Sequence, residues 1–341
     1  MLVPHSTGAL VFLILTILVA VVFDFTNGFH DTANAIATSV STRVLSPRIA
    51  IFMAAILNFV GAFVSTNVAK TIGSDVADTT SLTSVVVMSA LLAAIFWNLL
   101  TWYFALPSSS SHALIGGIIG AAVAGSATHF SVLKVGGIIK IVLSLLLSPI
   151  AGFVIAYLLI LGLTWLFRGF MPAQVTTTSR WLQRLSAAFV AFSHGSNDAQ
   201  KTMGVITAAV LAYQYGSTPT SFSVPDWVIL LCATAMALGT SFGGWRIIKT
   251  MGMHIAKLRP LDGFAAESSS ALVIMIASVL GLPVSTTHTI AGSIMGVGAR
   301  QRLSAVRWGV AGNMVFAWVL TGPITALLAA AIYAVFHLFG L

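Results

Sequence analysis

The sequence predicts an all-α polytopic membrane protein made of two inverted-topology repeats, with broken helices, re-entrant-type helical hairpins and about 10–12 membrane segments. Three observations carry this prediction. First, 58% of the 341 residues are hydrophobic and only 7% are charged, whereas soluble domains carry about 25% charged residues. Second, long apolar stretches follow one another along the whole chain. Third, two polar motifs recur in the same order in the two halves.

The apolar stretches give the expected helices in chain order. They cover residues 8–23, 33–45, 49–69, 82–106, 110–127, 132–167, 185–213, 227–248, 264–282, 286–299 and 305–339. As a single helix, residues 8–45 would be about 57 Å long, which is too long for a straight span. We therefore predict a helix that breaks at residues 24–31, where Gly28 tolerates unusual dihedral angles.

Basic residues orient the chain and mark its internal boundary. They cluster at residues 43–48, 168–184, 246–259 and 300–307. A count of crossings places all four clusters in the cytoplasm and both termini outside. The basic residues that give the net charge of +8 thus set the orientation of the chain in the membrane, and we expect no nucleic-acid partner. The expected organisation is an N-terminal repeat (1–168), a cytoplasmic linker (169–184) and a C-terminal repeat (185–341) that form one integral unit.

The first repeated motif places carboxylates beside apolar runs. It covers Asp24 to Asn34 in the first half and Phe192 to Lys201 in the second, so that Asp31 aligns with Asp198 at an offset of 167 positions. Three of the eight acidic residues of the chain lie in these two copies. A carboxylate inside a membrane segment is costly and indicates a functional site. Its recurrence in both halves is typical of a transporter built from two repeats.

The second repeated motif is a hydroxyl-rich turn before an apolar helix. Leu106 to His112 pairs with Leu282 to His288 at an offset of 176 positions. Helix N-termini with serine and threonine caps offer free N–H groups and partial positive charge to an oxyanion. We predict that two re-entrant hairpins enter from opposite faces and bring both turns to the midplane as a cage for a tetrahedral anion. Two full crossings are the alternative to the re-entrant hairpins. Helix caps and interhelical hydrogen bonds are the alternative to the anion cage.

The candidate anion ligands are the hydroxyls of the turns and the amides of the motifs. They are Asn27, Asn34, Ser109, Ser110, Ser111, Asn197, Ser285, Thr286 and Thr287. The acidic residues repel an anion, so we expect them to hold a coupling cation, either Na⁺ on oxygen ligands or a proton. These cation-coupling candidates are Asp24, Asp31, Asp198 and Glu267. Candidates for a proton or substrate role are His30, His112, Lys201 and His288. We expect no metal site beyond a Na⁺ site.

Structural alternatives remain for several of these residues. Asp198 can form a buried ion pair with Lys201, which lies three residues later on the same helix face. Glu267 can be a helix cap near the membrane interface. His112 and His288 can be hydrogen-bonded inside the bundle rather than act as proton carriers.

Together these motifs resemble the signatures of the inorganic phosphate transporter family, usually called PiT, in its bacterial type. The resemblance rests on Gly28 to Ala35, Trp97-Asn98 with Pro107 to His112, Ser193 to Thr202, and Pro283 to His288. It implies a secondary transporter that imports inorganic phosphate by symport with Na⁺ or H⁺ through alternating access, in the plasma or inner membrane. It further implies a homodimer, a lipid bilayer as surroundings and no enzyme activity. Some similar bacterial proteins carry phosphate as a metal complex.

The sequence departs from the family pattern at two places. The family often has an Asn-Asp pair in both signatures, whereas the first copy here has His30-Asp31. The second copy has Gln200-Lys201 where the first has Ala33-Asn34. These differences leave Na⁺ and H⁺ both open as coupling ion. A sulfate:cation symporter of the same superfamily is the alternative function. An anion channel is less favoured, because channels usually rely on oligomeric symmetry around a pore.

Overall fold

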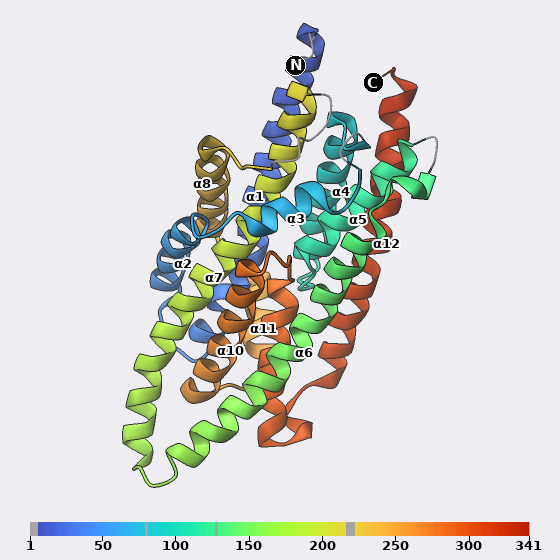
Figure 1. The fold of residues 1–341 in the computed structure, drawn as a ribbon. Coiled ribbons are helices and arrows are strands. Elements are labelled where there is room, and N and C mark those ends of the chain that lie inside the picture. The colour runs from blue at the N-terminus through green and yellow to red at the C-terminus, as the bar shows by residue number, and fades with distance from the viewer. Residues whose placement is uncertain (1–5, 79–80, 127–128, 216–221, 341) are drawn as a thin grey trace.

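The computed structural model describes residues 6–78, 81–126, 129–215 and 222–340, which form an elongated bundle of helices (Figure 1). The α-helices are α1 (Thr7–Ser41), α2 (Pro47–Gly61), α3 (Asn67–Ser74), α4 (Ser84–Tyr103), α5 (Ser110–Ala124), α6 (Val135–Leu166), α7 (Pro172–Tyr215), α8 (Asp226–Phe242), α9 (Trp245–Lys249), α10 (Pro260–Val279), α11 (Thr286–Gln301) and α12 (Trp308–Leu338). Short helical turns lie at His129–Val132, Thr250–His254 and Leu303–Ala305. The described residues contain no β-pairing beyond an isolated bridge between Ala77 and Leu133.

The helices confirm the predicted polytopic, all-α class. Within the described residues, five helices are long and apolar enough to cross a membrane, namely α1, α4, α6, α10 and α12. A sixth span results if α8 and the segment Trp245–His254, which are bent by 64° relative to each other, count as one broken span. Large apolar side chains such as Leu146, Leu147 and Ile150 of α6 are exposed on the outside of the bundle. A lipid bilayer solvates such a surface, whereas water does not.

The predicted break at residues 24–31 is wrong. Helix α1 is continuous from Thr7 to Ser41, and α7 is continuous through the second copy of the motif. A continuous helix pairs its backbone groups internally, which apolar surroundings favour. Gly28 serves close packing instead, because a Cβ at this position would overlap the backbone carbonyl of Met236 on α8. A break is found instead on the neighbouring α8, which is bent by 64° relative to the segment Trp245–His254.

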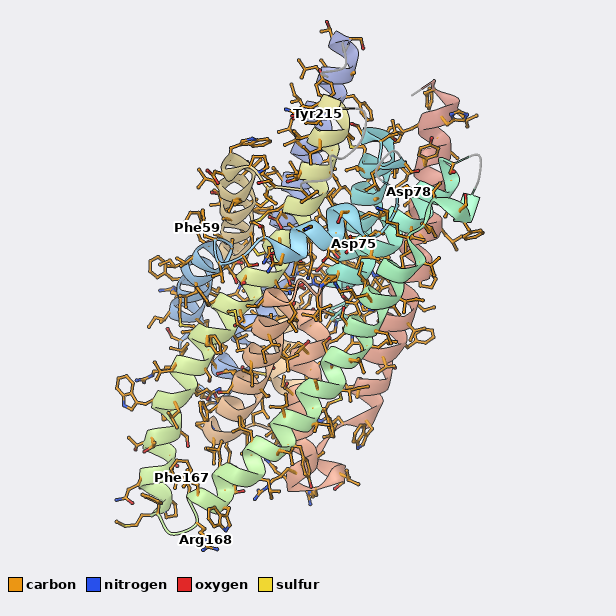
Figure 2. All side chains as sticks on the ribbon, in the orientation of Figure 1. Phe59, Asp75, Asp78, Phe167, Arg168 and Tyr215 are labelled. Carbon is orange, nitrogen blue, oxygen red and sulfur yellow. The ribbon has the colours of Figure 1, made fainter. Side chains whose placement is uncertain are left out.

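The expected linker is also largely helical. Residues 172–184 form the beginning of α7, and only residues 167–171 connect α6 to α7 without helical structure. Figure 2 shows Phe167 and Arg168 at this end of the bundle and Tyr215 and Asp78 toward the other. The start of α1 and the end of α12 lie together (Figure 1), at the end of the bundle opposite Arg168 (Figure 2).

Two helical hairpins approach each other from opposite ends of the bundle (Figure 1). The pair α4 and α5 lies in the upper half of Figure 1, and the pair α10 and α11 lies in the lower half. Their tips touch where Ser111 Oγ of α5 donates a hydrogen bond to the carbonyl of Val284, just before α11, at 3.0 Å. The two turns that are 176 positions apart in the sequence are therefore neighbours in space.

Each half of the chain packs its motif helix against the other half. Gly28 of α1 lies against α8, and Gly195 of α7 lies against the backbone of Asn58 on α2. The hairpins repeat this exchange, since Gly116 of α5 lies against α12 and Gly292 of α11 lies against α6. Small residues at these positions let the helix backbones approach closely, which is the usual way to pack helices in a membrane.

Candidate functional site

The middles of α1 and α7 and the two hairpin tips converge on one buried cluster of polar side chains. Its members are His30, Asp31, Asn34, Ser108, Ser110, Ser111, His194, Asn197, Asp198, Lys201, Thr286 and Thr287, and none is more than 2% exposed. Burial of this many polar groups is costly unless they are paired with one another. The hydrogen bonds described below show how the pairing is achieved.

Asp31 receives hydrogen bonds from both hairpins. Ser110 Oγ donates to Asp31 Oδ2 at 3.0 Å, and Thr287 Oγ1 donates to Asp31 Oδ1 at 3.4 Å. One turn further along α1, the amide of Asn34 donates to Thr287 Oγ1 at 2.9 Å and to Thr286 Oγ1 at 3.2 Å. The first motif thus contacts the tips of both hairpins through one carboxylate and one amide.

Asp198 occupies the matching position in the second half. Thr286 Oγ1 donates to Asp198 Oδ2 at 3.3 Å, just as Ser110, its counterpart in the first turn, donates to Asp31. Lys201 Nζ lies 2.6 Å from Asp198 Oδ1, which is the buried ion pair that the sequence analysis named as an alternative. The same ammonium donates to Ser111 Oγ at 2.5 Å.

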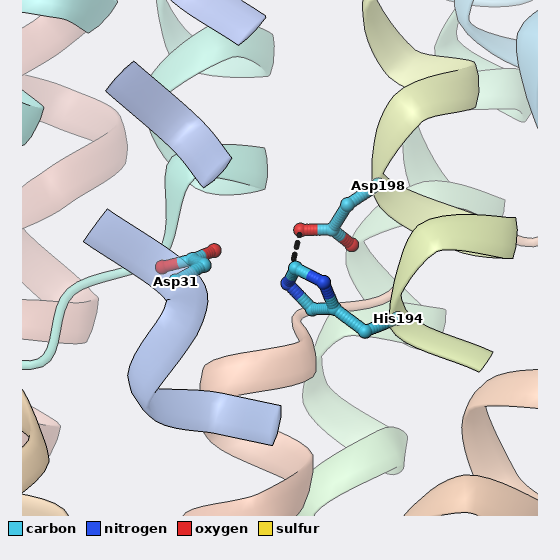
Figure 3. Close-up of side chains that lie close together, drawn as sticks. All are labelled: Asp31, His194 and Asp198. Atoms are coloured by element: carbon cyan, nitrogen blue, oxygen red, sulfur yellow. Dashed lines mark ion pairs between the residues drawn. The ribbon is translucent and has the colours of Figure 1, made fainter. Parts of the chain in front are cut away.

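The two aspartates face each other together with a histidine. Figure 3 shows Asp31 on α1 opposite His194 and Asp198 on α7. Each of the three offers an atom that could bind a metal ion, and these atoms lie within 4.8 Å of one another. His194 Nε2 is 3.6 Å from Asp198 Oδ2, and Nδ1 is 3.0 Å from Asn58 Oδ1. No role was predicted for His194 from the sequence. Its spacing of four residues from Asp198 would have indicated the contact if the motif had been read as a helix.

His30 joins the first aspartate to the hydroxyls beside the first hairpin tip. Its Nδ1 lies 2.6 Å from Asp31 Oδ1. Its Nε2 lies 3.3 Å from Thr101 Oγ1 and 3.4 Å from Ser108 Oγ. His30 is therefore in direct contact with a candidate cation ligand, whereas Thr101 is a contact that the sequence motifs did not single out.

Asp24 and Asn27 lie one to two turns before Asp31 on the same helix. Thr202 Oγ1 of α7 donates to Asp24 Oδ1 at 2.9 Å. Among the described residues, no hydrogen-bond partner is found for Asp24 Oδ2 or for the amide of Asn27, although both side chains are fully buried. The observed hydrogen bonds connect neither residue to a hairpin tip.

Glu267 belongs to a different cluster, so the structure does not bring it together with the aspartates. Thr38 Oγ1 and Ser186 Oγ each donate to its carboxylate at 2.5 Å, and Gln183 Nε2 donates at 3.1 Å. Thr38 lies seven residues after Asp31 on α1, about 10 Å along the helix axis. The alternative that Glu267 is an interfacial helix cap is wrong, because Glu267 lies inside α10, seven residues after its first residue, Pro260. Asp262 fills that role, since its Oδ2 accepts from the backbone N–H of Arg259 at 2.9 Å.

The remaining candidates of the turns divide into caps and cluster members. Ser109 and Ser285 are helix caps, and each Oγ accepts from the backbone N–H three residues later at 3.2 Å. Asn197 fixes the second hairpin, because its Nδ2 donates to Ser278 Oγ at 3.0 Å and its Oδ1 accepts from the backbone N–H of Val284 at 3.4 Å. These three residues therefore position the tips, whereas Ser110, Thr286 and Thr287 contact the carboxylates.

The rings of His112 and His288 lie against each other at a tilt of 34° beside the hairpin tips. Their ring centroids are 4.7 Å apart, and the ring of His288 stacks on Trp318 of α12 at 3.9 Å. His112 Nδ1 also lies 2.9 Å from Ser109 Oγ. His112 is thus hydrogen-bonded as its structural alternative expects, whereas His288 Nε2 is buried without a hydrogen-bond partner among the described residues. The proton or substrate role of both histidines stays a prediction from the sequence.

Comparisons with known proteins agree with one another. Residues 27–329 match the family described as the phosphate transporter family. A probable low-affinity inorganic phosphate transporter of Rhizobium meliloti is 51% identical over 329 residues, which are 96% of this chain and 97% of that protein. A protein of Bacillus subtilis with the same description is 50% identical over 333 residues, 96% of this chain and 99% of that protein. A solved structure described as "The sodium-dependent phosphate transporter" matches with a TM-score of 0.89 at 27% identity, over 96% of this chain and 99% of that one.

Proposed function

Because this chain belongs to the phosphate transporter family, we propose that it imports inorganic phosphate into the cell by symport with a cation. The chain is a multi-pass membrane protein, and its relatives are transporters of phosphate rather than enzymes. The direction of transport, the coupling cation and the mechanism are our proposal. The observation that carries it is the convergence of both hairpin tips on the carboxylate of Asp31.

Phosphate is proposed to bind between the two tips. The N-termini of α5 and α11 meet there, and each supplies free N–H groups with partial positive charge. The hydroxyls of Ser110, Thr286 and Thr287 and the amide of Asn34 provide further donors. This combination suits a tetrahedral oxyanion that presents several acceptor oxygens.

The coupling follows from the fact that each hydroxyl has only one proton to donate. Ser110 and Thr287 direct their protons to Asp31. A cation at Asp31 would take over the carboxylate oxygens and allow these hydroxyls to turn to phosphate. The cation would also cancel the repulsion between the carboxylate and the anion, so that each substrate favours binding of the other.

Na⁺ is the cation that the surroundings of Asp31 favour. Among the described residues, Asn34 Oδ1 and Asn27 Oδ1, each about one turn from Asp31 on α1, are buried oxygen atoms without a hydrogen-bond partner, and oxygen ligands are those preferred by hard cations. Asp24 Oδ2 also lacks a partner, but it lies two turns from Asp31, so Asp24 is proposed as a cation ligand outside the central cluster. The structural relative is described as sodium-dependent. A proton is the alternative, favoured by the distance of 2.6 Å between His30 Nδ1 and Asp31 Oδ1. Glu267, surrounded by neutral donors, is proposed as a further cation ligand outside the central cluster.

Alternating access is proposed to arise from two inverted repeats that move against each other. The packing supports this proposal, because corresponding helices of the two halves make corresponding contacts. Helix α1 lies on α8 as α7 lies on α2, and α5 lies on α12 as α11 lies on α6. Each motif helix and each hairpin is thus in contact with the opposite half, so a shift of one half changes both sides of the site. The homodimer, the external termini and uptake of phosphate as a metal complex stay predictions from the sequence.

Uptake by the purified protein in liposomes tests the proposed function. We expect labelled phosphate to accumulate when a Na⁺ gradient is imposed and not under a pH gradient alone. Accumulation under the pH gradient alone would assign the coupling to protons. Excess sulfate separates the two candidate anions, since inhibition by sulfate would favour the sulfate symporter. Flux that ignores both gradients and does not saturate would contradict symport and indicate a channel.

A further inference from the structure

The two halves of the site differ at one pair of matching positions. Asn34 follows Asp31 by three residues, and Lys201 follows Asp198 by three residues, so the two are 167 positions apart like the aspartates. Both side chains reach the hairpin of the opposite half. Asn34 Nδ2 contacts Thr287, and Lys201 Nζ contacts Ser111, which is the counterpart of Thr287 in the first turn. A neutral amide in one half therefore corresponds to an ammonium in the other.

The ammonium of Lys201 is surrounded by oxygen atoms of the kinds that bind a free cation. It lies 2.6 Å from Asp198 Oδ1, 2.5 Å from Ser111 Oγ and 3.1 Å from the carbonyl oxygen of Val284. These are one carboxylate, one hydroxyl and one backbone carbonyl, a set that hard cations accept. The side chain is 1% exposed, and its three protons match these three acceptors.

We propose that the Lys201 ammonium is a tethered cation that permanently occupies the Asp198 half of the site. The exchangeable coupling cation then binds in the Asp31 half, where the corresponding residue, Asn34, brings no charge. This inference rests on the proposed cation-coupled transport and specifies its stoichiometry. A site with asparagine in both halves would take up one more cation with each phosphate, so Lys201 lowers the number of cations and the charge moved in each cycle.

A count of bound Na⁺ tests the proposal without phosphate transport. Purified wild-type protein, Lys201→Asn and the control Lys70→Asn are titrated with labelled Na⁺ at equilibrium. Lys70 is an exposed lysine on α3, so the control changes the same side chain outside the site. We expect Lys201→Asn to bind one more Na⁺ per chain than wild type, and Lys70→Asn to match wild type. Equal counts for Lys201→Asn and wild type would overturn the proposal.

Chemical rescue of a variant with a shortened side chain, Lys201→Ala, provides a second test. It can replace the Na⁺ count if Lys201→Asn does not fold. We expect Lys201→Ala to lose phosphate uptake at least about tenfold, because Asp198 is left buried without its partner. Methylammonium, which can fill the space with a free cation, should restore uptake, whereas acetamide of similar size should not. Uptake by Lys201→Ala at the wild-type level, equal rescue by acetamide, or no rescue by methylammonium would each contradict a tethered cation.

The outcomes separate this inference from the proposed function. If wild-type uptake does not depend on any cation gradient, symport is wrong, but the difference in Na⁺ count between Lys201→Asn and wild type still reports on the Asp198 half. If uptake is driven by a gradient and the counts are equal, symport stands and only the role of Lys201 is wrong.

Discussion

Thr287, at the tip of the second hairpin, donates a hydrogen bond to Asp31, which lies 256 residues earlier in the chain, at 3.4 Å. This contact joins the motif of one half to the hydroxyl turn of the other. With the bond from Ser110 to the same carboxylate, it makes Asp31 the point where both hairpins meet. The carboxylate that repels phosphate is thereby held by the hydroxyls that are proposed to bind phosphate.

Asp31→Asn should reduce coupled phosphate uptake at least about tenfold, equivalent to about 1.4 kcal/mol. The amide keeps the shape of the side chain but removes the charge that attracts the cation. Uptake of labelled phosphate into proteoliposomes measures the effect, with protein content checked by quantitative blotting. Asp226→Asn is the matched control, because Asp226 is exposed at the start of α8 and should tolerate the change. Wild-type uptake by Asp31→Asn would remove this residue from the coupling site.

Thr287→Val should raise the phosphate concentration for half-maximal uptake by about 5-fold, because the variant loses one hydrogen bond to phosphate, which contributes about 1 kcal/mol. Valine keeps the branched shape and removes the hydroxyl. Thr289→Val is the control on the same helix, since Thr289 Oγ1 donates to the backbone carbonyl of Ser285 and not to the cluster. Initial rates of uptake at varied phosphate concentration give the comparison. If the two variants have the same half-saturation as wild type, the Thr287 hydroxyl does not take part in phosphate binding.

Glu267→Gln should weaken the stabilisation of the protein by Na⁺. Three neutral groups donate to the Glu267 carboxylate, and no cationic side chain of the described residues forms an ion pair with it. A bound cation would supply the missing charge, and a ligand at about 100 times its dissociation constant stabilises by about 2.7 kcal/mol. Thermal unfolding in detergent with Na⁺ or with choline measures this difference. An equal Na⁺-dependent shift in wild type and variant would exclude Glu267 as a cation ligand.

Gly28→Ala should destabilise the bundle by about 1–3 kcal/mol, because overpacking forces the helices apart. A Cβ at Gly28 would overlap the carbonyl of Met236, so α1 and α8 could not keep their separation. Gly162→Ala on α6 is the control, since a Cβ there meets no atom of the described residues within 4 Å. The control should be neutral or more stable, as alanine favours helix over glycine. Unfolding midpoints in detergent compare the two, and equal midpoints would refute the close approach of α1 and α8.

The positions of the helices along the chain could be predicted from the sequence more accurately than whether the two motif helices, α1 and α7, are continuous. The apolar stretches anticipated each long helix, and the Pro-to-His turns anticipated the opposed hairpins. The break at residues 24–31 was predicted mainly because the apolar segment is too long for a straight span, but a long helix can also stay continuous and tilt in the membrane. Side chains from the hairpins satisfy Asp31, so α1 keeps its backbone hydrogen bonds. Helix α7 is also continuous, and it therefore places His194 beside Asp198, a contact that the motif alone did not indicate.

The sequence by itself determined the membrane class, the two repeated motifs and the residue types that can hold an anion and a cation. It could not decide which residues contact each other. Helices long enough to span the membrane, such as α4 and α12, are apolar on most faces, so no amphipathic stripe fixes how each helix is rotated. Only the tertiary structure placed Lys201 between Asp198 and Ser111, and Glu267 with Thr38 rather than with the aspartates. Close packing at small residues fixes those rotations, and it depends on pairs of helices far apart in the chain.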